Sequence, residues 1–295
     1  MIPAMIYFLT DNDLTASSAV LRVRGPDANT YLQGQFTQEL RVPDGGVAYG
    51  LWLDQKGKVL ADSHVLRQKD NDYLVVSFSA TAPQLLARLQ AFLVADEVEM
   101  QDESGNWSGV LLWGEGAARL RPPAGGLVLP SRRAGLGAVQ WLVPRERSGA
   151  VAAGLKVDSA IQGDPPAAEL ARLRAGLPAV PVDIGSRDLP NEGGLEDVAI
   201  SYTKGCYLGQ EVMARLKNLG QVRRRLHLVQ GDGAPPLPGS ALYQGECRVG
   251  ETRSAVADGK SFLALAMISM INFDPASGLS WSPGSGPGLK IIRRV

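Results

Sequence analysis

Residues 201–225 read SYTKGCYLGQEVMARLKNLGQVRRR and combine a cysteine between two glycines, an amphipathic pattern and a basic end. The apolar spacing predicts a helix over 208–216. Cys206 would then lie near the amino terminus of that helix, where free N–H groups and the helix dipole favour a thiolate, and Lys204 adds positive charge. A buried, inert cysteine remains the alternative.

Polar and charged residues surround this stretch. Gln210 and Glu211 fall in the first helical turn, where Glu211 serves either the helix dipole or a ligand. Residues 204–227 carry six basic side chains against one acid, and residues 183–197 carry five acids against one arginine. Such runs indicate either a solvated face or a basic patch for a polyanionic ligand or RNA.

Composition narrows the class of protein. The 295 residues carry 30 basic and 30 acidic side chains, which argues against a protein that coats DNA. Two cysteines and two histidines are too few for a disulfide scaffold, a four-cysteine zinc site or a self-ligated iron–sulfur cluster. The longest apolar run, 262–273, is too short to span a bilayer. With no basic leader at the amino terminus, we expect a soluble, cytoplasmic protein with no membrane partner.

Alternation and turn signals predict an α+β fold. Expected strands cover 18–24, 47–53, 59–66, 73–78, 98–100, 110–113 and 139–143. Expected helices cover 27–32, 81–93, 148–155 and 167–175, and the segment 119–137 is expected to be loop. Short strands over 225–229, 247–252, 262–267 and 289–293 predict a small β-barrel at the carboxyl end.

Several familiar catalytic motifs are incomplete or absent in the sequence. Gly259, Lys260 and Ser261 end like a phosphate-binding loop, but Ser254 occupies the position of the required first glycine, so a surface turn is expected. No HExxH or GxSxG motif occurs.

The stretch KGCYLGQE at 204–211 resembles the K-G-C-[YF]-x-G-Q-E signature of YgfZ-type folate-binding proteins. These proteins are relatives of the glycine-cleavage T-protein, an aminomethyltransferase, and belong to a group implicated in iron–sulfur cluster assembly or repair. Further similarity lies in LQGQFT (32–37), LDQKGKVLAD (53–62), RLRAGLP (172–178), LPNE (189–192), LED (195–197) and VGETRS (249–254).

The resemblance implies three domains around a central funnel that binds a reduced folate. The expected ranges are a discontinuous folate-binding-like domain at 1–45 plus 145–222, an inserted α+β domain at 46–144, and the β-barrel at 223–295. The implied function is that of a folate-binding accessory protein for iron–sulfur cluster assembly or repair and the tRNA modification that depends on it. Its implied partners are reduced folate, iron–sulfur proteins or assembly factors and, indirectly, tRNA. The implied cofactor is tetrahydrofolate or a derivative, without a stably bound metal.

The resemblance also nominates site residues. Cys206 is the expected key thiol, with Lys204 and Asp62 as further catalytic candidates. The candidates for holding the folate are Tyr207, Gln210, Glu211, Arg215 and Arg174.

Two departures from the T-protein pattern narrow the chemistry. Its paired aspartates correspond here to Ala61 and Asp62, so one carboxylate remains, which argues against glycine-cleavage chemistry. Arg174 stands where the family carries a glutamate. Two alternatives remain open: a tetrahydrofolate-dependent one-carbon transferase, and a non-catalytic module that binds RNA or protein. The sequence therefore leaves open whether the chain is an enzyme.

Overall fold

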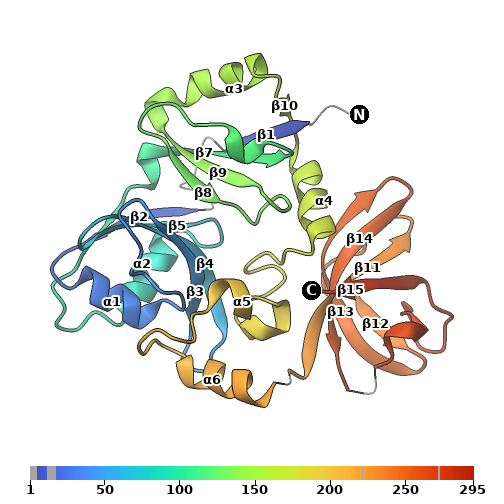
Figure 1. Cartoon of the computed structure of the whole chain (residues 1–295). Coiled ribbons are helices and arrows are strands. Elements are labelled where there is room, and N and C mark those ends of the chain that lie inside the picture. The colour runs from blue at the N-terminus through green and yellow to red at the C-terminus, as the bar shows by residue number, and fades with distance from the viewer. Residues whose placement is uncertain (1–4, 12–17, 221, 272) are drawn as a thin grey trace.

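In the part of the chain that the structure describes, three five-stranded sheets organise the molecule (Figure 1). The computed structural model describes residues 5–11, 18–220, 222–271 and 273–295. The α+β class expected from the sequence is observed, because helices cover sheets whose neighbouring strands are mostly antiparallel.

One sheet has the strand order β3-β4-β5-β2-β6 and is called the α1/α2 sheet here. Its strands are β2 (Ala19–Arg24), β3 (Val47–Leu53), β4 (Val59–Lys69), β5 (Asp72–Ser77) and β6 (Glu99–Asp102). Helices α1 (Ala28–Gln35) and α2 (Ala82–Gln90) place apolar side chains such as Leu32 and Leu89 in one buried cluster with Trp52 and Tyr73 of the strands. Burial of that shared apolar surface stabilises the layer.

A second sheet, the α3/α4 sheet, has the order β10-β1-β7-β9-β8. Its strands are β1 (Ile6–Asp11), β7 (Trp107–Gly114), β8 (Leu127–Pro130), β9 (Val139–Pro144) and β10 (Ile161–Gln162). Helix α3 (Ser148–Val157) buries Val151 and Leu155 against Trp141. Ala168 of helix α4 (Pro165–Ala175) packs in a separate cluster with Trp113. Helix α4 thus lies between this sheet and the carboxyl-terminal sheet (Figure 1).

The carboxyl-terminal sheet has the order β12-β13-β14-β11-β15 and is wholly antiparallel. Its strands are β11 (Arg224–Asp232), β12 (Ala241–Gln244), β13 (Cys247–Asp258), β14 (Ser261–Ser269) and β15 (Leu289–Arg294). Isolated bridges join Tyr243 to Ser280 and Leu279 to Leu289. Closure into a barrel stays a prediction. Residues 259–260 form the turn between β13 and β14, as expected for the false phosphate-loop motif.

A connecting segment runs from α4 to β11 through α5 (Glu196–Ala199) and α6 (Gln210–Leu219). Its buried side chains join those of β3 and β14 in one apolar cluster, so the segment packs against two of the sheets. Short 3₁₀ helices complete the described secondary structure: Ser104–Asn106, Ala117–Arg119, Arg145–Arg147, Pro190–Gly193 and Pro275–Ser277.

The structure corrects several expected boundaries. The expected loop at 119–137 contains strand β8, the helix expected at 81–93 ends at Gln90, and the helix expected at 208–216 covers Gln210–Leu219. Strand β2 pairs with β5 and β6, and β1 pairs with β7 and β10. The three-domain division stays a prediction.

Candidate functional site

A cavity of about 480 Å³ opens between the α1/α2 sheet, the α3/α4 sheet and helix α4, and is called the central cavity here. Its volume falls in the usual range for small-molecule sites. The lining residues are Leu9, Asp62, Phe78, Ser79, Leu111, Arg132, Arg133, Pro165, Ala168, Glu169, Arg172 and 178–182. The cavity therefore combines apolar walls with a small set of charged groups.

Asp62 supplies a carboxyl group to this cavity from strand β4. The Tyr49 hydroxyl donates to its Oδ2 at 2.8 Å, and Ser79 Oγ accepts its backbone N–H at 3.0 Å. Burial raises the pKa of Asp62, while hydrogen bonds from Ser79 and Tyr49 partly oppose that shift. Of the predicted site residues, only Asp62 lines the central cavity.

His64 lies two residues further along the same strand and therefore on the same face as Asp62. Its ring is 5.1 Å from the Tyr49 ring, centroid to centroid. Burial and the nearby Arg132 lower the pKa of His64 to about 4, so the side chain is neutral at physiological pH.

Arg172 is a cavity residue whose hydrogen-bonding groups are already used. Its guanidinium donates to Glu169, to Asp183, to the carbonyl of Leu177 and to Ser254 Oγ. The Asp183 carboxylate in turn accepts from the backbone N–H and the hydroxyl of Ser254, at 3.0 and 2.6 Å. This network ties α4, the segment after it and strand β13 together, so it holds one wall of the cavity in place.

Lys204 lies in a buried position outside the cavity. Its ammonium donates to the backbone carbonyls of Gln33, Phe36 and Gln38 at 2.9, 2.7 and 2.9 Å. Burial lowers the pKa of Lys204 to about 8. All three ammonium protons are used at and just beyond the end of α1, where helix carbonyls lack intrahelical partners.

The loop that carries the KGCYLGQE motif at 204–211, called the signature loop here, thus covers the carboxyl end of helix α1. Besides Lys204, the backbone N–H of Leu208 donates to the carbonyl of Gly34 at 3.1 Å. Thr37 Oγ1 donates to the carbonyl of Ala199 at 2.6 Å. The motifs LQGQFT and KGCYLGQE, far apart in sequence, therefore lie side by side.

Cys206 is exposed in this loop. The structure corrects its expected place, because α6 begins only at Gln210, after Gly209 in a left-handed conformation with φ +84°. A Cβ on Gly209 would lie 2.8 Å from the carbonyl oxygen of Asp54, so the loop packs tightly on the β3–β4 turn. Cys206 presents its thiol to solvent rather than to the central cavity.

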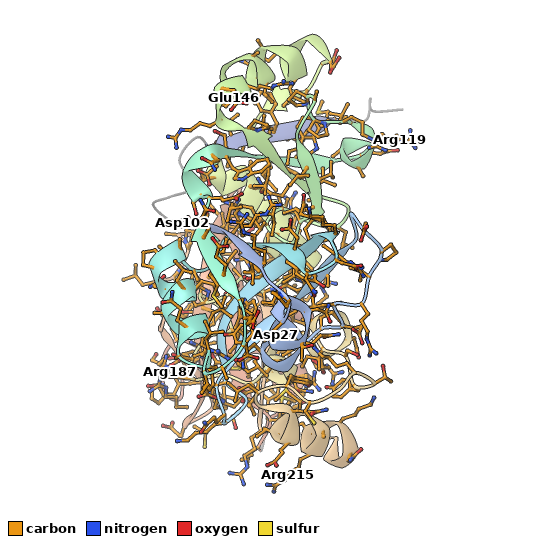
Figure 2. The ribbon with its side chains drawn as sticks, turned by 90° about the vertical axis from the view of Figure 1, so that its left-hand side faces the viewer. Asp27, Asp102, Arg119, Glu146, Arg187 and Arg215 are labelled. Carbon is orange, nitrogen blue, oxygen red and sulfur yellow. The ribbon has the colours of Figure 1, made fainter. Side chains whose placement is uncertain are left out.

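The other signature candidates divide into buried and exposed positions. Tyr207 belongs to the apolar cluster of the connecting segment, and burial raises the pKa of its hydroxyl. Gln210 is half-buried at the start of α6, and Glu211 and Arg215 are exposed. Arg215 lies at the end of the molecule formed by α6 (Figure 2). Their predicted role in folate binding stays a prediction.

Arg174 lies on the solvent side of α4, with its side chain 59% exposed, and forms an ion pair with Asp258 of β13 at 2.7 Å. It does not line the cavity, although Glu169 and Arg172 of the same helix do.

Two arginines of the basic run pair with three carboxylates of the acidic run. Arg224 contacts Asp188 and Glu192 at 3.2 and 3.0 Å, and Arg225 lies 3.6 Å from Glu196. The net positive charge counted along residues 204–227 is therefore reduced in space, which weakens the prediction of a basic RNA-binding patch.

Sequence reasoning missed Arg132, Arg133, Glu169 and Arg172. The adjacent arginines Arg132 and Arg133 are visible in the sequence, but no local pattern connects them with Asp62 or with the helix that carries Glu169 and Arg172. Across the described ranges, no three His, Cys, Asp or Glu side chains are grouped to hold a metal ion. Among the helices described, none has the length and apolar character needed to cross a membrane.

Comparisons with known proteins bear on the family and the fold. The GCVT N-terminal domain model matches residues 13–121. The chain is 28% identical over 277 residues to the human mitochondrial iron–sulfur cluster assembly factor IBA57, covering 84% of this chain and 74% of that protein. It is 28% identical over 291 residues to the tRNA-modifying protein YgfZ of Edwardsiella ictaluri, covering 86% and 83%. The glycine cleavage system aminomethyltransferase T of Bartonella henselae superposes with a TM-score of 0.81 at 17% identity, covering 98% and 85%.

The fold is that of the glycine-cleavage aminomethyltransferases, built here on three sheets. Together, the family model, the YgfZ and IBA57 relatives and the structural neighbour support a YgfZ-type, aminomethyltransferase-like family for this chain.

Proposed function

We propose that this protein binds a reduced folate in the central cavity and acts as an accessory factor in iron–sulfur cluster assembly or in the tRNA modification that depends on it. The observation that carries the proposal is the central cavity itself, with the Asp62 carboxyl in its wall. Relatives named as an iron–sulfur cluster assembly factor and as a tRNA-modifying protein support the proposed role as an accessory factor.

The residues of the cavity fit a folate chemically. A pterin offers N–H groups that a carboxyl can accept, and Asp62 provides one. Phe78 and the apolar strap at 178–182 offer surface to flat rings, and cationic groups suit an acidic tail. When bound, a reduced folate would supply a one-carbon carrier. Asp62 would hold or release a proton beside it, since burial raises the pKa of this carboxyl group.

Cys206 belongs to a different part of this proposal. Its thiol is exposed, so it suits contact with a partner protein better than contact with a ligand in the cavity. We propose that partners of the iron–sulfur class meet the protein at the signature loop.

The experiment is calorimetric titration of the protein with tetrahydrofolate, for the wild type, Asp62→Asn and Asp232→Asn. Asp232 is an exposed aspartate at the end of β11 and serves as the matched control. We expect binding by the wild type and the control, and at least about 10-fold weaker binding by Asp62→Asn, because a charged hydrogen-bond acceptor is lost. No binding by the wild type would overturn the folate half of the proposal.

A one-carbon transferase is the second candidate, because Asp62 lies in the cavity with a raised pKa that suits proton transfer. Methylene transfer to tetrahydrofolate that disappears in Asp62→Asn would favour it over the accessory role. Folate binding without transfer would reject it.

A further inference from the structure

We propose that Arg132 and Arg133 form an anion-binding end of the central cavity and that the ligand of this cavity presents a carboxylate to them. For the folate of the proposed function, on which this inference rests, the carboxylates are those of the glutamyl tail.

The two arginines are held in a closed loop between β8 and β9. The backbone N–H of Ser131 donates to the carbonyl of Ala138 at 2.9 Å, and Ser131 Oγ accepts from the backbone N–H of Arg133 at 3.2 Å. Both arginine side chains line the central cavity. The loop therefore delivers two neighbouring guanidinium groups to one end of the cavity.

The positive charge of Arg132 acts on the Asp62 carboxyl and the Tyr49 hydroxyl and opposes the rise in the pKa of both groups. Its guanidinium carbon lies 5.5 Å from the centre of the Tyr49 ring. Its Nε is buried and has no hydrogen-bond partner in the part of the chain that the structure describes. A buried N–H without a partner costs free energy, which an incoming acceptor would recover.

Arg133 has one side-chain hydrogen bond within the described ranges, to Gln140 Oε1 at 3.1 Å. Its guanidinium carbon lies 4.8 Å from the centre of the Phe78 ring. Burial lowers the pKa of Arg133, and the charges of Asp11 and Asp62 oppose that effect. Arginine nevertheless stays protonated in proteins, so the buried positive charge persists.

Arg172 is a cavity arginine whose guanidinium N–H groups are all used in hydrogen bonds, to two carboxylates, a carbonyl and a hydroxyl. Compared with Arg172, Arg132 and Arg133 use fewer of their guanidinium N–H groups in hydrogen bonds to the described residues. Guanidinium groups bind carboxylates through paired hydrogen bonds, so a ligand carboxylate fits this end of the cavity.

Three probes separate the two parts of such a ligand: tetrahydrofolate, a tetrahydropterin that lacks the tail, and p-aminobenzoylglutamate, which lacks the pterin. Each is titrated calorimetrically into the wild type, Arg132→Gln, Arg133→Gln and Arg119→Gln. Arg119 is an exposed arginine on the periphery of the molecule and controls for loss of charge alone (Figure 2). Thermal unfolding and circular dichroism verify that each variant is folded. Arg132→Lys and Arg133→Lys keep the positive charge but lack the paired N–H donors of a guanidinium group.

We expect both glutamine variants to bind tetrahydrofolate and p-aminobenzoylglutamate at least about 10-fold more weakly, and the tail-free pterin as the wild type does. Arg119→Gln should bind all three like the wild type, and the lysine variants should recover part of the loss. Equal tetrahydrofolate binding by the wild type and both glutamine variants would overturn the inference and leave the proposed function standing.

The folate proposal can also fail while the anion-binding site is confirmed. If the wild type binds p-aminobenzoylglutamate through the arginines but binds neither pterin compound, the anion site stands and the folate proposal falls. If the wild type binds none of the three probes, both are overturned.

Discussion

Arg172 and Asp183 form an ion pair of 2.7 Å whose side chains are only 4% and 0% exposed. Arg172 comes from α4, Asp183 from the segment that follows it, and Ser254 of β13 hydrogen-bonds to both. One charge network thus joins a wall of the central cavity to the carboxyl-terminal sheet.

We predict that Asp183→Asn lowers the free energy of unfolding by about 3–5 kcal/mol, because it removes the fully buried one of the two carboxylates that balance the buried Arg172 charge. Urea unfolding measures the change. Arg174→Gln is the matched control: its ion pair with Asp258 has the same 2.7 Å distance but is exposed, so its loss should cost less than about 1 kcal/mol. Equal losses in the two variants would contradict the role assigned to burial.

Lys204→Met should destabilise the protein by about 2–4 kcal/mol, because three carbonyls at and beyond the end of α1 lose their donor. Lys217→Met, which removes an exposed lysine lying over the Tyr202 ring, should cost less than about 1 kcal/mol. Chemical denaturation of both variants tests this. A Lys204 variant as stable as the wild type would show that water replaces the ammonium at these carbonyls.

His64 predicts a pH dependence of stability. Its folded pKa of about 4 lies below the ordinary 6.5, so between these values the unfolded chain binds the proton more readily. Stability should therefore fall as the pH drops from about 6.5 to about 4, by up to about 3 kcal/mol.

The difference between wild type and His64→Gln isolates this contribution, because the neighbouring Asp62, Tyr49 and Arg132 are present in both. The raised pKa of Asp62 acts in the opposite direction and cancels in that difference. Urea unfolding at pH 7, 6 and 5 gives the two curves. Parallel curves would mean that the folded protein accommodates a charged imidazole.

Cys206→Ala should leave the free energy of unfolding within about 0.5 kcal/mol of the wild type and leave tetrahydrofolate affinity unchanged, because the side chain is exposed and outside the cavity. In a strain that lacks the gene, the same variant should fail to restore function, whereas Cys247→Ala, at the other exposed cysteine, should restore it. Full restoration by Cys206→Ala would remove the thiol from the proposal.

Local patterns predicted most strands well, because alternation and turn residues act over a few positions. Val47–Leu53 is the expected strand without change, whereas β8 was missed inside a segment rich in glycine and proline. Leu129 of β8 is fully buried beneath other elements, and only tertiary packing makes that short segment a strand.

The site was predicted less completely than the fold. Asp62 was named as a catalytic candidate through the hairpin motif, and the structure gives its place in the cavity. The charged groups around it come from α4 and the β8–β9 loop, which no local pattern connects. The predicted role of Lys204 beside the thiol rested on sequence proximity. The structure shows that its hydrogen bonds are with residues about 170 positions away.

The pairing of Arg224 and Arg225 with Asp188, Glu192 and Glu196 bears on the speed of association. Charges that already neutralise one another at short range attract little over the Debye length, about 8 Å at physiological ionic strength. Partners that approach the surface formed by these five residues should therefore associate without electrostatic steering. Their association rate constants should be the roughly 10⁵–10⁶ M⁻¹s⁻¹ typical of neutral surfaces and should depend little on salt. Selection among partners would then depend mainly on how slowly the correct complex dissociates.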